Sequence, residues 1–365
     1  MPRKPQPARL ADRPDDFERL GIDRVAIAVW EDGLRTDGGP GSYEWWYFDA
    51  TLDDGSTLVI AFFTKQMIDV GKPLAPHVTI QCDRPDDSHI DITTPVYADA
   101  FSAATDRCDV RVGPNTFRGD LHEYVIHAEG EGVVVDVTLT GQVRPWRPAT
   151  GHLLFGPRGD EMFAWLPSVP QGRVTATITV AGSTETLAGI GYHDHNWGNV
   201  SMLTLMNHWY WARARIGDYT VIASYITAET AYGGIGIPVF LLARGDEVLA
   251  DDPARVNFTV TDVHVDEETG KPVADTVIYD YDDSSRYRIT FHRRETILRH
   301  HFVDDLSEFK HMLAKLMGFD GAYLRFTGDL ELQRFADDIS VEHLHHEAVW
   351  ELMYFGHVRA DPNAR

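Results

Sequence analysis

The densest group of chemically active side chains in the sequence lies at residues 189–198, a run that begins and ends with glycine. Alternating side chains in a glycine-flanked run are typical of a β-strand entering a tight corner. On such a strand Tyr192, Asp194 and Asn196 share one face. His193, His195 and Trp197 share the other face. A carboxyl beside aromatic rings is a candidate proton donor with a raised pKa. We therefore predict that Asp194 is a catalytic acid oriented by Tyr192; the alternative is an aspartate that hydrogen-bonds a corner.

The spacing of His193 and His195 allows a second interpretation. Two histidines separated by one residue on a strand could hold a metal ion from one face. A third ligand could come from His343, His345 or His346, but nothing in the sequence brings these residues close. Histidines in this pattern are more often hydrogen-bonded strand residues, and we predict no metal site.

Aromatic residues gather around the same stretch and around the first expected hairpins. Glu44 leads an otherwise apolar strand face, so its carboxylate needs a partner or a function. Ring faces can line a cavity that holds an apolar ligand and stabilises a carbocation; the alternative is core filling. The predicted substrate-binding residues are Glu44, Trp46, Trp165, His195, Asn196, Trp197, Trp209 and Trp211, to which the resemblance described below adds Phe163.

Composition excludes several classes of function. The net charge of −23 argues against nucleic-acid binding and against an anionic membrane surface, because both require basic surface. The two cysteines form no disulfide framework, and we expect them to be buried. We find no signal peptide and no apolar run near the roughly 20 residues of a membrane helix, so we expect a cytoplasmic protein. Nucleotide-binding loops and serine-hydrolase motifs are absent, and we predict no cofactor.

Many short strands separated by turn residues predict an all-β protein built from barrels or sandwiches. One helix is expected at residues 306–317, where apolar residues follow helical spacing. Trp46 and Thr57 recur at a constant offset of 163 as Trp209 and Thr220, which favours two similar β domains. The predicted organisation is a loosely packed lead-in at residues 1–20, an N-terminal domain at residues 21–200 and a C-terminal domain at residues 201–365.

From about residue 40 onward, the sequence resembles the carotenoid 1,2-hydratases and their lipocalin-like relatives, which include AttH-like proteins, kievitone hydratase-like proteins and fungal Diels–Alderases. The residues that carry the resemblance are Glu44-Trp45-Trp46-Tyr47, Phe163-Ala164-Trp165 and Gly191-Tyr192-His193-Asp194-His195-Asn196-Trp197-Gly198.

The resemblance implies two lipocalin-like (calycin-type) antiparallel β-barrels in tandem and cofactor-free chemistry on an alkene. It also implies that Asp194 is the acid, that Tyr192 lies beside it, and that Trp165 lines the same pocket. The hydratase pattern has a histidine where this chain has Phe163.

Three hypotheses follow for the reaction. In the first, Asp194 protonates a C=C bond of an isoprenoid or polyene, and water or an internal alkene captures the cation. In the second, a pericyclase or isomerase folds a linear polyene while Asp194 and Tyr192 polarise a carbonyl. In the third, the chain is a carrier for an apolar ligand and catalyses nothing. In each case the expected partner is an apolar small molecule.

Overall fold

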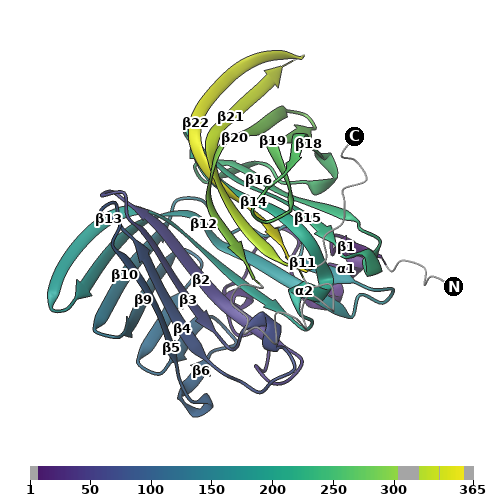
Figure 1. Cartoon of the computed structure of the whole chain (residues 1–365). Coiled ribbons are helices and arrows are strands. Elements are labelled where there is room, and N and C mark those ends of the chain that lie inside the picture. The colour runs from purple at the N-terminus through teal and green to yellow at the C-terminus, as the bar shows by residue number, and fades with distance from the viewer. Residues whose placement is uncertain (1–6, 303–319, 337, 357–365) are drawn as a thin grey trace. The chain divides into compact units, whose positions relative to one another are not determined.

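The computed structural model describes residues 7–302, 320–336 and 338–356, and Figure 1 shows the chain as a ribbon. The chain divides into two compact units. The first unit is Leu10–Ser201, and the second is Met202–Arg365 together with Met1–Arg9. Each unit is built on one large antiparallel β-sheet. The helix expected at residues 306–317 lies outside the described residues.

The sheet of the first unit runs in the order β5-β4-β3-β2-β13-β12-β10-β9-β8-β7-β6, and β11 also pairs with β12. Its strands are β2 (Tyr43–Leu52), β3 (Thr57–Phe63), β4 (His77–Asp83), β5 (His89–Pro95), β6 (Phe101–Ala103), β7 (Cys108–Val112), β8 (Asn115–Gly119), β9 (Glu123–Gly130), β10 (Val133–Gly141), β11 (His152–Phe155), β12 (Glu161–Val180) and β13 (Ser183–Gly198). Short 3₁₀ turns lie at Val29–Asp32, Met67–Asp69 and Ala98–Ala100.

Alternating burial explains how this sheet encloses a core. Along β10, Val133, Val135 and Val137 are buried, whereas Asp136 between them is exposed. Trp46 and Phe48 contribute to the same core from β2. The sheet curls around this core, and β5 comes into contact with β9.

The second unit has a sheet with the order β17-β16-β15-β14-β22-β21-β20-β19-β18. Its strands are β14 (Met206–Ile216), β15 (Tyr219–Ala228), β16 (Gly236–Arg244), β17 (Glu247–Ala250), β18 (Val256–Val265), β19 (Pro272–Asp282), β20 (Arg286–His301), β21 (Ala322–Ala336) and β22 (Ile339–Tyr354). Short helical segments lie at α2 (Met202–Leu205), Thr230–Tyr232 and Pro253–Arg255.

The two sheets share one strand order. In each, four consecutive strands form a meander, and the last strand returns to pair with the first strand of that meander. The residue-level repeat is displaced by one position in the first hairpin. Trp46 pairs with Phe62, whereas Trp209 pairs with Ile226 rather than with Tyr225, the residue that the constant offset requires. As a result Trp46 is in a core, but the core residue at the equivalent place on β14 is Tyr210.

Residues 7–20 differ from the loosely packed lead-in that the sequence suggests. Ala8–Leu10 forms the short strand β1 and Pro14–Leu20 forms the helix α1, with Phe17 buried. Gly21 ends this helix in the left-handed conformation at φ 66°. The burial expected for the two cysteines is confirmed. Among the described residues, no helix has both the length and the apolar character needed to cross a membrane.

Candidate active site

Strand β13 places the candidate acid between two neighbouring strands. Its last residues, which carry the chemically active side chains, pair with β2 on one side and with β12 on the other. Asp194 lies opposite Tyr47 of β2, and Asn196 lies opposite Trp165 of β12. Gly191 permits the close approach of β2, because a Cβ at this position would lie 2.7 Å from the carbonyl oxygen of Asp49.

Three side chains donate hydrogen bonds to the carboxyl group of Asp194. The Tyr192 hydroxyl and the Trp165 Nε1–H donate to Oδ2 at 2.8 and 2.7 Å, and the Asn196 amide donates to Oδ1 at 2.7 Å. The same indole N–H also lies 3.1 Å from the Tyr192 oxygen. The carboxyl is therefore fixed by donors on both of its oxygens, and the expected shared face of Tyr192, Asp194 and Asn196 is observed.

Burial dominates the electrostatics of this carboxyl. Asp194 is 8% exposed and Tyr192 is fully buried. Burial raises the pKa of Asp194 from 3.8 to about 6, although the hydrogen bonds from Tyr192, Trp165 and Asn196 and the nearby His193 each favour the ionised form. With this pKa, roughly a tenth of the Asp194 carboxyl groups are protonated at pH 7, a far larger fraction than for an ordinary surface aspartate.

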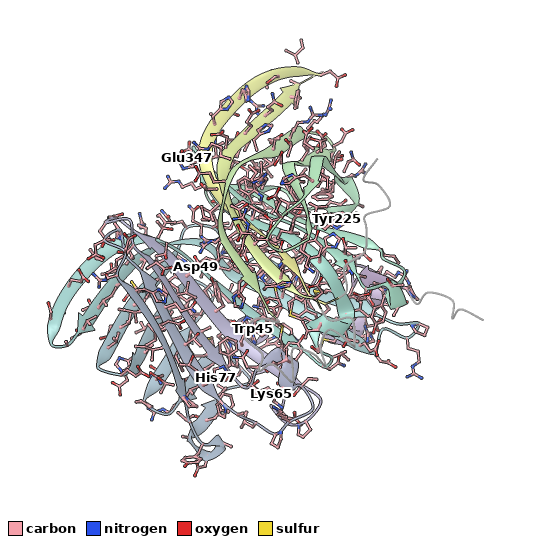
Figure 2. The ribbon with its side chains drawn as sticks, in the orientation of Figure 1. Trp45, Asp49, Lys65, His77, Tyr225 and Glu347 are labelled. Carbon is pink, nitrogen blue, oxygen red and sulfur yellow. The ribbon has the colours of Figure 1, made fainter. Side chains whose placement is uncertain are left out.

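Aromatic rings continue this face of the sheet. Tyr47 contacts Tyr192 edge to face, with the ring centroids 6.4 Å apart, and Trp146 contacts Trp165 in the same way at 6.4 Å. Phe163 stacks against Trp45 at 6.1 Å. Trp45 and Asp49 mark the course of β2 in Figure 2. Trp165 thus contacts Asp194 directly, and Phe163 lies two residues before it on β12; their role in substrate binding stays a prediction.

Four of the predicted substrate-binding residues lie on the opposite face of the same strands. Trp46 and Glu44 of β2 are fully buried, and they pair with His195 and Trp197 of β13. The Trp46 ring stacks on the His195 ring at 4.6 Å. The physical reason is the two-residue period of a strand, which turns these four side chains away from the carboxyl group of Asp194.

Glu44 has a partner for each carboxylate oxygen. The His195 Nε2 lies 2.7 Å from Oε1, which also accepts the backbone N–H of Arg35. The hydroxyl and the N–H of Thr36 donate to Oε2 at 2.7 and 2.8 Å. Hydrogen bonds to both oxygens of Glu44 therefore explain how this side chain is accommodated on an apolar face.

A second buried carboxyl group, that of Asp32, lies beside these residues. We call Glu44, Asp32, His193 and His195 the inner cluster. Its Oδ2 accepts the Tyr124 hydroxyl and lies 3.3 Å from His193 Nε2, and its Oδ1 lies 3.4 Å from His195 Nδ1. Burial raises the pKa of Asp32, but the charges of His193 and His195 and the hydrogen bonds from His193 and Tyr124 outweigh it, so this pKa lies below its usual value. Hydrogen bonds therefore reach Oδ2 of Asp32, whereas Asp32 Oδ1 and His195 Nδ1 are buried without a hydrogen-bond partner among the described residues.

His193 belongs to one of two groups of side chains among the described residues that could hold a metal ion. Asp32, Cys108 and His193 each offer one ligand atom, and these atoms lie within 4.8 Å of one another. The other group is Glu331 with His343 and His345, in the second unit. In the first group the Cys108 thiol donates a hydrogen bond to the Phe117 carbonyl oxygen, and burial raises the pKa of this thiol well above its ordinary value. The absence of a metal site stays a prediction.

The remaining predicted residues, Trp209 and Trp211, lie on β14 in the second unit and take no part in the hydrogen bonding of Asp194 described above. The first unit has a pocket of about 240 Å³ whose lining includes Trp165, Leu166 and Trp197. Asp194 is not among the residues that line it.

The sequence analysis assigns no site role to Asp32, Tyr124, Tyr47 or Trp146, although Tyr47 belongs to one of the motifs that carry the resemblance. Tyr47 could have been found from the pairing of neighbouring strands, and Trp146 from the presence of a tryptophan in a Pro-Trp-Arg-Pro loop. Asp32 and Tyr124 reach His193 from 161 and 69 residues away in the chain, and no sequence signal indicates contacts of that separation.

Comparison with known proteins identifies the family and agrees with this fold. Residues 120–322 match the family model described as Diels-Alderase-like, and the chain belongs to this family. A solved relative in fold is kievitone hydratase from Nectria haematococca, which has 13% sequence identity and a TM-score of 0.53 over 96% of this chain and 97% of that one. The two-domain lipocalin-like architecture implied by the resemblance is confirmed.

Two curated relatives have informative names. The chain is 24% identical over 240 residues to an acyclic carotenoid 1,2-hydratase of Rubrivivax gelatinosus, covering 61% of this chain and 57% of the relative. It is 27% identical over 199 residues to a quinolone epoxide rearrangement protein of Emericella nidulans, covering 50% of this chain and 53% of the relative. The chain thus spans a little more than half the length of the curated relatives it matches.

Proposed function

We propose that the chain is an enzyme in which Asp194 donates a proton to a C=C bond of an apolar isoprenoid or polyene substrate. The observation that carries this proposal is a buried carboxyl with a pKa of about 6, held by the side chains of Tyr192, Trp165 and Asn196. A general acid works best when its pKa lies near the operating pH, and it contributes about 10²–10⁴-fold to the rate.

Each residue then has a defined role. The proton moves from Asp194 to one alkene carbon, and the π-electron pair forms the new C–H bond, so that a cation develops on the other carbon. The aromatic faces of Tyr192, Trp165 and Tyr47 stabilise that cation. Water adds to it and loses a proton to the Asp194 carboxylate, which restores the acid. The net reaction is the addition of one water molecule.

The names of the relatives support this chemistry and a second outcome of it. The carotenoid hydratase favours hydration. The epoxide rearrangement protein and the family model favour rearrangement or cyclisation, in which the same acid protonates an epoxide oxygen or an alkene and a proton is lost from carbon at the end. The presence of Phe163 next to Trp45, where the hydratase pattern has histidine, also favours this second outcome.

The test is turnover of an acyclic carotenoid in D₂O, followed by mass spectrometry, for wild type, Asp194→Asn and the control Asp99→Asn. Asp99 is an exposed aspartate in the 3₁₀ turn Ala98–Ala100 of the same unit. We expect wild type and the control to give a product heavier by one D₂O with deuterium on carbon, and Asp194→Asn to lose about 10²–10⁴-fold in rate. A product of unchanged mass without deuterium on carbon would establish a pericyclic reaction, and recovery of the intact carotenoid would favour a carrier.

A further inference from the structure

The second unit contains a cavity of about 520 Å³ at one end of its own core. This volume is within the range of small-molecule sites, which span about 300–1,000 Å³. Its apolar lining includes Tyr210, Tyr225, Phe258 and Tyr354, of which Tyr225, labelled in Figure 2, stacks flat on Phe258 at 3.9 Å. Gly236 leaves room for this ring, because a Cβ there would lie 1.8 Å from the Tyr225 hydroxyl.

A polar relay lies at the wall of this cavity. The carboxylate of Glu229 accepts a hydrogen bond from the side-chain amide of Asn207 at 3.0 Å, and the Asn207 oxygen lies 2.8 Å from His208 Nδ1. The other ring nitrogen, Nε2, lies 3.2 Å from the Thr227 hydroxyl. Asn207, His208 and Thr227 all line the cavity, and Asn207 is only 3% exposed.

The relay fixes which nitrogen of His208 can accept a proton. A carboxylate cannot donate, so the Asn207 amide nitrogen faces Glu229, and the Asn207 oxygen is left to accept from His208 Nδ1–H. In the neutral imidazole Nε2 is then an acceptor, and the Thr227 hydroxyl donates to it. A ligand hydroxyl that donates to the Thr227 oxygen would continue the same chain of donors and acceptors.

The backbone is shaped to produce this arrangement. Asn207 lies at a bulge between the paired residues Met206 and His208, so two consecutive side chains of β14 reach one side of the sheet. His208 is also directly opposite Thr227 on β15 and Tyr354 on β22. A bulge beside a cavity is a common way of aiming side chains at a ligand.

We infer that this cavity is a binding site for a flat, ring-bearing apolar molecule with a hydroxyl group, separate from the Asp194 site. Aromatic walls favour a flat ring, and the end of the relay selects a hydroxyl donor. The inference does not rest on the proposed function, because none of its residues takes part in the hydrogen bonding of Asp194.

The test is fluorescence titration of the full chain with 2-naphthol and with 2-methoxynaphthalene, which has the same rings but no donor. We expect 2-naphthol to bind more tightly than the ether. His208→Phe keeps a ring but removes Nε2, and Thr227→Val removes the hydroxyl; each should weaken 2-naphthol binding about fivefold and leave the ether unchanged.

Val260 lines the cavity, and Val265 on the same strand, β18, is 62% exposed, which makes the two valines a matched pair. Val260→Trp should abolish the binding of both probes, whereas Val265→Trp and Asp194→Asn should preserve it. Circular dichroism of each variant shows that it is folded. Full binding in a folded Val260→Trp would place the probe elsewhere, and an equal affinity of wild type for the two probes would overturn the assigned role of the relay.

Discussion

Replacing Asp194 with asparagine tests the electrostatic basis of the site without any substrate. Folding raises the pKa of this carboxyl from 3.8 to about 6, and each pKa unit corresponds to about 1.4 kcal/mol. When ionised, Asp194 therefore lowers the free energy of unfolding by about 3 kcal/mol relative to its protonated form. The extra stability of the protein with protonated Asp194 is fully present below pH 3.8 and is lost as the pH rises through about 6.

Asparagine cannot ionise, so it removes this destabilisation, and it retains most of the hydrogen bonds that Asp194 makes. Its oxygen can accept from Tyr192 and Trp165, and its amide nitrogen can donate to Asn196 once the Asn196 amide turns over. We expect Asp194→Asn to be more stable than wild type by about 3 kcal/mol at pH 8 and by about 1 kcal/mol at pH 4.5.

The assay is urea unfolding followed by tryptophan fluorescence at both pH values, with Asp99→Asn as the control for the same substitution at an exposed position. The control should stay within about 0.5 kcal/mol of wild type. An equal stability difference between Asp194→Asn and wild type at both pH values would show that folding does not raise the pKa of Asp194.

Three further predictions concern the same unit. With an acyclic carotenoid, kcat/KM should be constant below pH 6 and fall about tenfold per pH unit above it, because only the protonated form of Asp194 is active; a rate that rises with pH would contradict its role as the acid. Trp165→Phe removes an N–H that stabilises the carboxylate, so the midpoint of this pH profile should move upward, and a downward shift would show that the indole acts in another way. Glu44→Gln replaces a buried oxygen that accepts hydrogen bonds with an amide group that donates, so it should destabilise the protein by about 1–3 kcal/mol in urea unfolding. A loss below about 0.5 kcal/mol would mean that these hydrogen bonds contribute little to stability.

The candidate acid can be predicted from the sequence more readily than the residues that surround it. The two-residue period of a strand is local, and it places Tyr192, Asp194 and Asn196 on one face, as the structure shows. The same period separates Glu44 and Trp46 from them. The clustering of aromatic residues in the sequence nevertheless predicts one common pocket. Which face of β2 becomes the core depends on strands far away in the chain.

Long-range pairing also explains the missed residues and the strand ends. The sequence predicts many short strands, whereas β12 and β13 run on as strands of 20 and 16 residues. Pairing with β2 supports the glycines of β13, and Pro167 and Pro170 of β12 lie where the register with β13 shifts. Asp32 becomes part of the inner cluster only because the 3₁₀ turn Val29–Asp32 reaches His193.

The shared strand order allows corresponding positions in the two units to be compared, and their surroundings differ. In the first unit Glu44 lies between Thr64 and Trp197, and the His195 ring lies against its carboxyl group. In the second unit His208 lies in the same way between Thr227 and Tyr354, but there the strands leave a cavity.

A scaffold that occurs twice in one chain can be altered in one copy while the other is left intact. For protein engineering, the second unit is therefore the copy in which to install a new binding specificity, because its interior is already open and its changes need not disturb the charge balance around His195.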